Sequence, residues 1–168
     1  MSVVLPVLLG LLALCAELFL REAFALTRWS PDLAQVVVLW LAVRGWSVGG
    51  FVSAGLVGLL ADGFVGSPVG VHMLQALLLV LLAGLLADRV RFRTLPGRLV
   101  LGGVGSVVGL LLLVLVCRIF LGDTAIGGRV LDLLLPRSLV LMICVPLAFP
   151  LLDRLDALVS GRREADLA

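Results

Sequence analysis

Six long apolar stretches occupy most of this 168-residue chain, and they limit its possible folds more than any other feature. A helix needs about 20 predominantly apolar residues to cross the hydrocarbon core of a bilayer, which is roughly 30 Å thick. The first, fourth, fifth and sixth stretches reach or approach that length, whereas the second and third are short unless they are joined. The stretches cover residues 3–20, 33–47, 48–62, 68–88, 97–121 and 135–152.

The composition indicates that lipid is the solvent for these stretches. Hydrophobic residues make up 62% of the chain and the mean hydropathy is +1.25, while charged residues make up only 14%. Soluble domains carry about 25% charged residues, and a small domain leaves too much surface exposed to hide so many apolar side chains. The net charge of +2 gives no reason to expect a nucleic-acid partner. Cys15, Cys117 and Cys144 each lie inside an apolar stretch, so we interpret them as small buried hydrophobic residues.

The number of spans depends on the junction between the second and third stretches. A single helix over both would be roughly 45 Å long at about 1.5 Å per residue, which is too long for one crossing. Arg44, Gly45 and the pair Gly49-Gly50 fall at the junction and favour a turn. We therefore predict an all-α integral membrane protein, in which residues 1–152 form a six-helix transmembrane bundle and residues 153–168 form a short, fraying cytoplasmic tail. Five spans are the alternative.

The arginines predict the orientation of the bundle. Four of them lie in the short segment 89–98, and loops rich in arginine stay in the cytoplasm. With six spans, this placement puts the N- and C-termini in the cytoplasm as well. Five spans with an external N-terminus agree with the arginines equally well, so charge alone does not distinguish the two topologies.

Small residues mark the third stretch. Gly50, Ala54, Gly58 and Asp62 recur every four residues, so one face of the predicted helix is nearly bare of side chains and ends in a carboxylate. Such a face allows another helix to approach closely, which is how helices associate in lipid. We expect this small-residue stripe to pack against a partner. Asp62 is expected either to cap or pair across helices, or to lie exposed at the end of its span.

The link that follows is predicted to turn tightly. Gly66 and Gly70 permit backbone angles that other residues avoid, and Ser67 followed by Pro68 is typical of an N-cap and a first helical position. Ser30-Pro31-Asp32 has a similar form at the start of the second span: a cap, a proline and an acid.

His72 and Gln75 lie three residues apart on the fourth span, and they are the candidate polar contacts near the middle of the membrane. They could touch a ligand, although hydrogen bonds to neighbouring helices are the commoner use of such residues. No second histidine or acid stands at metal-ligand spacing from His72, and the spans contain no paired aspartates or Ser/His couple. We therefore predict no metal, no cofactor and no enzymatic activity.

Several of these motifs together resemble one family. Ser30-Pro31-Asp32, LAVRG over 41–45, GGF over 49–51, GLVGLLAD over 55–62 and GSPVG over 66–70 are similar to the bacterial rod shape-determining protein MreD family. Pro136 and the apolar segment 139–152 fit the last span of that family. The resemblance extends over nearly the whole chain, and its specific part covers about forty residues.

This resemblance implies a non-enzymatic, multi-pass component of the bacterial inner membrane that belongs to the cell-elongation machinery. Members of the family work with MreC, with the transglycosylase RodA and its partner transpeptidase, and indirectly with the actin-like MreB, to direct lateral peptidoglycan synthesis. The family is also similar in fold to the six-helix substrate-binding components of energy-coupling-factor transporters. A small-molecule-binding component of that type is therefore the alternative function, although the first span lacks the Ala-xxx-Ala pattern of those proteins.

Overall fold

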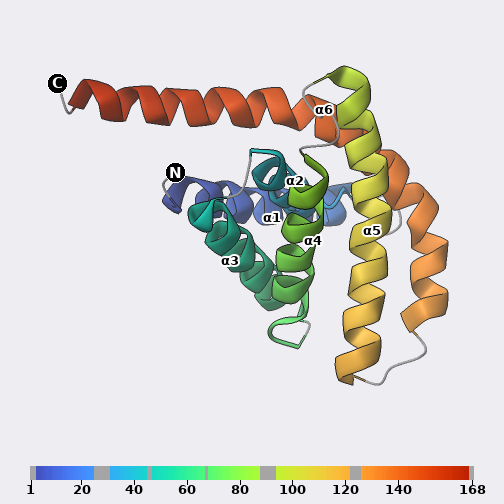
Figure 1. Cartoon of the computed structure of the whole chain (residues 1–168). Coiled ribbons are helices and arrows are strands. Elements are labelled where there is room, and N and C mark those ends of the chain that lie inside the picture. Colours follow the sequence, from blue (N-terminus) through green and yellow to red (C-terminus); the bar gives the residue numbers. More distant parts are fainter. Residues whose placement is uncertain are drawn as a thin grey trace.

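The computed structural model of the chain consists of six α-helices (Figure 1). It describes residues 3–24, 31–44, 47–66, 68–87, 94–121 and 126–166. The side-chain surroundings are described for these residues except 24, 87, 120–121, 126–133 and 159–166. The helices are α1 (Val4–Phe24), α2 (Leu33–Val43), α3 (Val48–Val65), α4 (Val71–Ala87), α5 (Leu95–Leu121) and α6 (Ile126–Asp166). The arginine-rich segment 89–93 and the predicted caps Ser30 and Ser67 lie outside the described residues.

The helical membrane class predicted from the sequence is confirmed. Four helices, α1, α3, α5 and α6, are long and apolar enough to cross a membrane. Helices α2 and α4 are apolar but shorter, with 11 and 17 residues. Because α2 and α3 are separate helices, the single long helix of the five-span alternative does not form in the described structure. Six crossings and cytoplasmic termini stay predictions.

Helix α2 lies at the centre of the molecule. It contacts each of the other five helices, and nine of its eleven residues are buried. Leu39, Trp40 and Leu41 are at most 2% exposed and pack with residues such as Leu141 and Val145 of α6 in one continuous core. The helix begins at Asp32, whose side chain accepts a hydrogen bond from the backbone N–H of Gln35 at 3.0 Å. The acid itself is therefore the N-cap, a role that the sequence assigned to Ser30.

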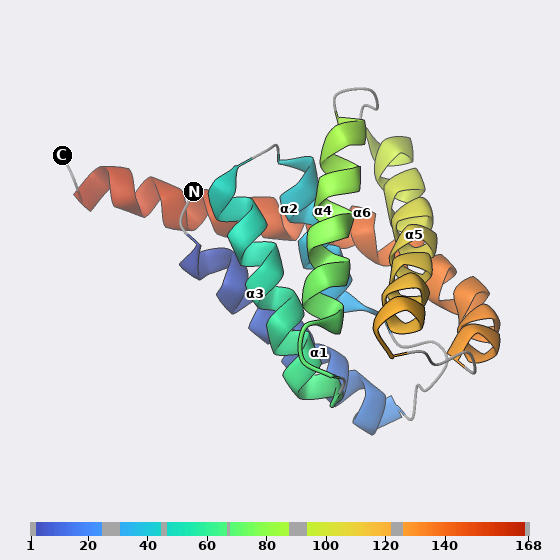
Figure 2. The same cartoon turned by 60° about the horizontal axis from the view of Figure 1, so that its bottom comes forward.

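Helix α6 is longer than the last span predicted over 135–152. It begins at Ile126, ten residues before Pro136, and its segment suited to crossing a membrane is Leu134–Leu158. The helix continues to Asp166, so the fraying predicted for the tail is wrong. Figures 1 and 2 both show that α6 bends, and that its red C-terminal part crosses the end of the bundle nearly at right angles to α4 and α5. Pro146 and Pro150 lie inside α6, and a proline within a helix removes a backbone hydrogen bond and bends the axis.

Candidate partner groove and interior polar sites

Asp62 fixes the start of α4. It lies in the last turn of α3, is 1% exposed, and accepts hydrogen bonds at 2.8 Å from the backbone N–H groups of Gly70 and His72. The Nδ1 atom of His72 lies 2.9 Å from the same carboxylate. The first N–H groups of a helix have no partner within it, and a helix N-terminus attracts negative charge. Asp62 therefore caps α4 from the preceding helix, and the exposed alternative for this residue is wrong.

The link between α3 and α4 uses its glycines as expected. Gly66 and Gly70 have φ angles of 70° and 103°, in the region that L-residues with a side chain rarely adopt. Helix α4 nevertheless begins at Val71, so the helix start predicted at Pro68 is wrong. The physical reason is that Asp62 supplies the capping oxygens, while the positive φ of Gly70 is not helical.

The small-residue stripe faces the interior of the chain. Gly50, Ala54, Gly58 and Asp62 are all buried. A Cβ atom added at Gly58 would lie 2.6 Å from the backbone oxygen of His72, so the backbones of α3 and α4 are in direct contact there. From Ala54 to Asp62 the stripe thus packs the protein's own helices, which corrects the expectation that the whole stripe faces a partner protein. A Cβ atom added at Gly50 would meet only the Ser47 hydroxyl, so contact with a partner stays a prediction for Gly50.

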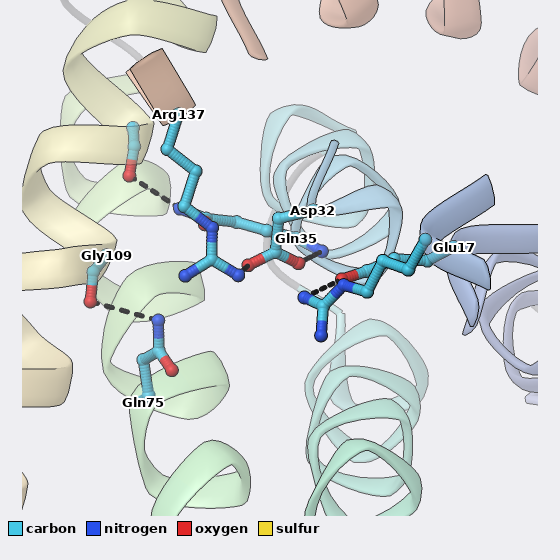
Figure 3. Close-up of polar contacts among 8 residues, drawn as sticks. Glu17, Asp32, Gln35, Gln75, Gly109 and Arg137 are labelled. Atoms are coloured by element: carbon cyan, nitrogen blue, oxygen red, sulfur yellow. Dashed lines mark hydrogen bonds and ion pairs between the residues drawn. The ribbon is translucent and has the colours of Figure 1, made fainter. Parts of the chain in front are cut away.

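Two buried glutamines connect α2 and α4 to α5. The Nε2 atom of Gln35 donates to the backbone oxygen of Gly105 at 2.8 Å, and that of Gln75 donates to the backbone oxygen of Gly109 at 2.9 Å (Figure 3). A Cβ atom at Gly109 would overlap the amide of Gln35, so a glycine is needed for this approach. Gln75 is therefore a helix-to-helix contact, the commoner of the two roles predicted for it.

Charged residues surround the N-terminal end of α2. Figure 3 shows Asp32 between Arg137 of α6 and Glu17 of α1. The carboxylate of Asp32 pairs with Arg137 at 3.2 Å, and Glu17 pairs with Arg21 one turn away at 2.6 Å. Charges at membrane depth are costly unless they are paired, and these four residues satisfy one another.

A small cavity lies beside this charged group. It has a volume of about 40 Å³ and is lined on its polar side by Asp32, Gln35, His72 and Gln75, with Gly58 and small apolar residues completing the wall. The structure thus brings the predicted pair His72 and Gln75 to one site and adds two residues of α2. Gln35 was the available sequence signal, because it is the one amide in an otherwise apolar stretch.

The opposite end of α2 holds a second polar cluster, which the sequence did not predict. Arg44 forms ion pairs with Asp156 and, at 3.6 Å, with Asp153 of α6, and its guanidinium stacks over the ring of Trp40. The indole N–H of Trp40 donates to Asp153 at 2.9 Å, and Arg98 of α5 approaches the same carboxylate at 3.8 Å. These contacts hold the bent part of α6 against α2 and α5.

An apolar groove of about 360 Å³ opens between α2, α3 and α4 at this end of the molecule. Figures 1 and 2 show α3 and α4 meeting at their link and diverging from it, with α2 between their far ends. Leu41 and Ala42 of α2 contribute to the lining, which is completed by Ser47, Val48, Gly50, Phe51, Val80, Leu81 and Gly84. We call this feature the α3–α4 groove.

The fold and these sites define a helical membrane protein with a polar interior layer and a lateral apolar groove. Within the described residues, no group of three or more His, Cys, Asp or Glu side chains could hold a metal ion. Comparisons with protein-family models, with curated proteins and with solved structures find no match for the chain.

Proposed function

We propose that the chain is a non-enzymatic scaffold of the bacterial cell-elongation machinery in the inner membrane. In this role it helps MreC, RodA and the partner transpeptidase to direct lateral peptidoglycan synthesis and to maintain rod shape, with MreB as an indirect partner. The proposal rests on the resemblance of residues 30–70 to the MreD family. The structural observation that supports it is the α3–α4 groove, an apolar surface suited to a further transmembrane helix.

The groove replaces the small-residue stripe as the candidate partner surface. Gly50 and Gly84 belong to its lining, and small residues allow close approach between helices in lipid. Phe51 and Leu81 are exposed at the groove and offer apolar area to a partner. Atoms that line an unfilled groove lack dispersion contacts on one side. A complementary helix from MreC or the synthase supplies these contacts, and this stabilises its complex with the chain.

Co-purification of MreC tests this assignment. A Gly50→Leu variant is expected to recover less MreC than the unmodified chain, because the new side chain fills the groove while its Cβ meets only the Ser47 hydroxyl. Gly63→Leu is the matched control on the same helix, since Gly63 is exposed and a Cβ there has nothing within 4 Å. Equal recovery of MreC with all three proteins would remove the groove from the interface.

Depletion in the bacterium that encodes the chain tests the function itself. Rods that turn into spheres, and recover when the chain is restored, would support a role in elongation, whereas unchanged rods would contradict it. The transporter alternative has less support, because pockets for small molecules usually measure about 300–1,000 Å³ with convergent polar groups. The polar cavity measures about 40 Å³, and the larger groove is apolar.

A further inference from the structure

The cavity between α2, α3 and α4 differs from ordinary packing voids because the polar side chains of Asp32, Gln35, His72 and Gln75 line it. Gln35 and Gln75 are 6% and 8% exposed, and both belong to its wall. Their Nε2 atoms donate to backbone carbonyls of α5, and this fixes the orientation of each amide because a carbonyl can only accept. Each Oε1 atom therefore lies on the other branch of its amide, and the side-chain hydrogen bonds described for the two glutamines use only their Nε2 atoms.

Asp32 supplies a third acceptor. One carboxylate oxygen accepts the backbone N–H of Gln35 at 3.0 Å, and the other pairs with Arg137 at 3.2 Å. A carboxylate offers about four lone-pair sites, so Asp32 retains capacity for another donor. The cavity thus presents acceptors from Asp32, α2 and α4, while one amide N–H of each glutamine is used on α5.

We propose that this cavity binds a primary ammonium group, either from a small free amine or from the ethanolamine headgroup of a phospholipid. A primary ammonium carries three N–H donors, which matches two amide oxygens and one carboxylate. A cavity needs about 10–15 Å³ to hold one water-sized group, so a volume of about 40 Å³ admits an ammonium and the start of its stem but not a bulky quaternary amine. The Asp32 carboxylate favours a cationic donor over a neutral one.

The ammonium group can reach this site from the end of the molecule that holds the α3–α4 link. The side chains of Asp32 and His72 are 19% and 23% exposed, whereas Gln35 and Gln75 are more deeply buried and are bonded to α5. Arg137, beside Asp32, is positioned to meet the phosphate of a lipid whose ammonium occupies the cavity. This assignment does not depend on the proposed role in cell elongation.

Ligand-dependent stability of the full chain in nanodiscs tests the proposal. Methylammonium chloride is expected to raise the apparent unfolding midpoint, and at 100 times its Kd the folded-to-unfolded ratio rises about 100-fold. Tetramethylammonium chloride and sodium chloride at equal concentration are expected to give no such shift. The lipid source is distinguished by comparing phosphatidylethanolamine with phosphatidylcholine nanodiscs, since the choline headgroup has no N–H donor.

A variant that fills the cavity shows whether a shift in the unfolding midpoint comes from binding at this site. Ala76 lines the cavity and is 6% exposed, so Ala76→Val is expected to abolish the response to both methylammonium and phosphatidylethanolamine. Ala16→Val, at an exposed position of α1, is the matched control and is expected to respond fully. Line broadening of ¹⁵N-methylammonium by the unmodified protein gives a second measurement if Ala76→Val fails to fold. Equal responses to methylammonium and tetramethylammonium, or a response that survives in Ala76→Val, would overturn the proposal.

Discussion

Replacing Gly58 with alanine should push α3 and α4 apart, and the size of the effect can be worked out from the structure. The added Cβ would lie 2.6 Å from both the backbone oxygen of His72 and the Cα atom of Met73. Backbone atoms cannot rotate away as a side chain can, so the two helices must separate until the contact reaches about 3.4 Å. Gly55, one turn earlier on α3, provides the matched control, because its added Cβ would meet side-chain atoms instead of backbone: Leu77 at 3.3 Å and Met73 at 3.8 Å.

The free-energy difference between the two variants isolates this backbone contact. Both substitutions gain about 1 kcal/mol of helix propensity, which cancels in the comparison. Overpacking typically costs about 1–3 kcal/mol, and separation of α3 from α4 also stretches the 2.8 Å hydrogen bonds from Gly70 and His72 to Asp62. We therefore expect Gly58→Ala to be about 1–3 kcal/mol less stable than Gly55→Ala.

Reversible unfolding in mixed detergent micelles measures this difference, with sodium dodecyl sulfate as the denaturant. Amide hydrogen exchange at His72 gives an independent signal, since the N–H that Asp62 accepts should exchange faster in Gly58→Ala than in Gly55→Ala. Equal stability of the two variants, or a more stable Gly58→Ala, would refute the inference that the α3 and α4 backbones touch at this position.

Three further substitutions test the interior polar contacts. Asp62→Asn replaces one acceptor oxygen by a donor, so the partly buried N–H of either Gly70 or His72 loses its acceptor, at a cost of about 1–3 kcal/mol. Unchanged amide exchange at both residues would contradict this. Gln75→Leu removes an interhelical hydrogen bond and should lower the free energy of unfolding by about 0.6–1.7 kcal/mol in the same detergent titration; a neutral result would mean that the amide does not bond to α5. Asp153→Asn keeps an acceptor for the indole N–H of Trp40, whereas Asp153→Ala leaves that N–H unsatisfied. The alanine variant should therefore be less stable than the asparagine variant by about 1–3 kcal/mol. Equal stabilities would exclude the hydrogen bond.

The sequence predicts the class of fold and most helix positions because lipid imposes a simple rule on length and composition. The six apolar stretches correspond to six helices, and the turn at Arg44 separates α2 from α3. The positive φ angles of Gly66 and Gly70 follow from local chemistry, since only glycine adopts them at no steric cost. Each of these features is determined by a single residue or by a single apolar stretch, so the sequence alone predicts it.

The features that the sequence did not predict depend on contacts between distant residues. Trp40 and Asp153 are 113 positions apart, and no local pattern indicates that they form a hydrogen bond. The sequence also does not predict which helix the small-residue stripe contacts. A bare helix face can pack against a neighbour within the chain as well as against a partner protein. Sequence spacing shows that such a face packs closely, but it does not show which helix it meets.

Helix α2 explains how a short segment can belong to a membrane bundle. Its 11 residues span about 16 Å, roughly half of the hydrocarbon thickness. The length requirement applies to helices that face lipid, whereas α2 is enclosed by five other helices. Backbone at membrane depth is tolerated where protein surrounds it, and both ends of α2 are held by ion pairs, from Asp32 to Arg137 and from Arg44 to Asp156. A crossing by α2 is therefore compatible with its length.

The six-span topology makes a prediction that a five-span chain does not share. Ser47 and Leu158 are exposed at the end of the molecule that holds Arg44, and Val69 is exposed beyond the other end of α3. Single cysteines at these positions, in a chain with Cys15, Cys117 and Cys144 changed to alanine, should react with a membrane-impermeant maleimide. Cys15 must be removed because it is exposed, which makes the buried position predicted for it wrong. We expect Ser47→Cys and Leu158→Cys to be labelled from the cytoplasmic side and Val69→Cys from the opposite side. Labelling of Val69→Cys and Ser47→Cys from the same side would mean that α3 does not cross the membrane.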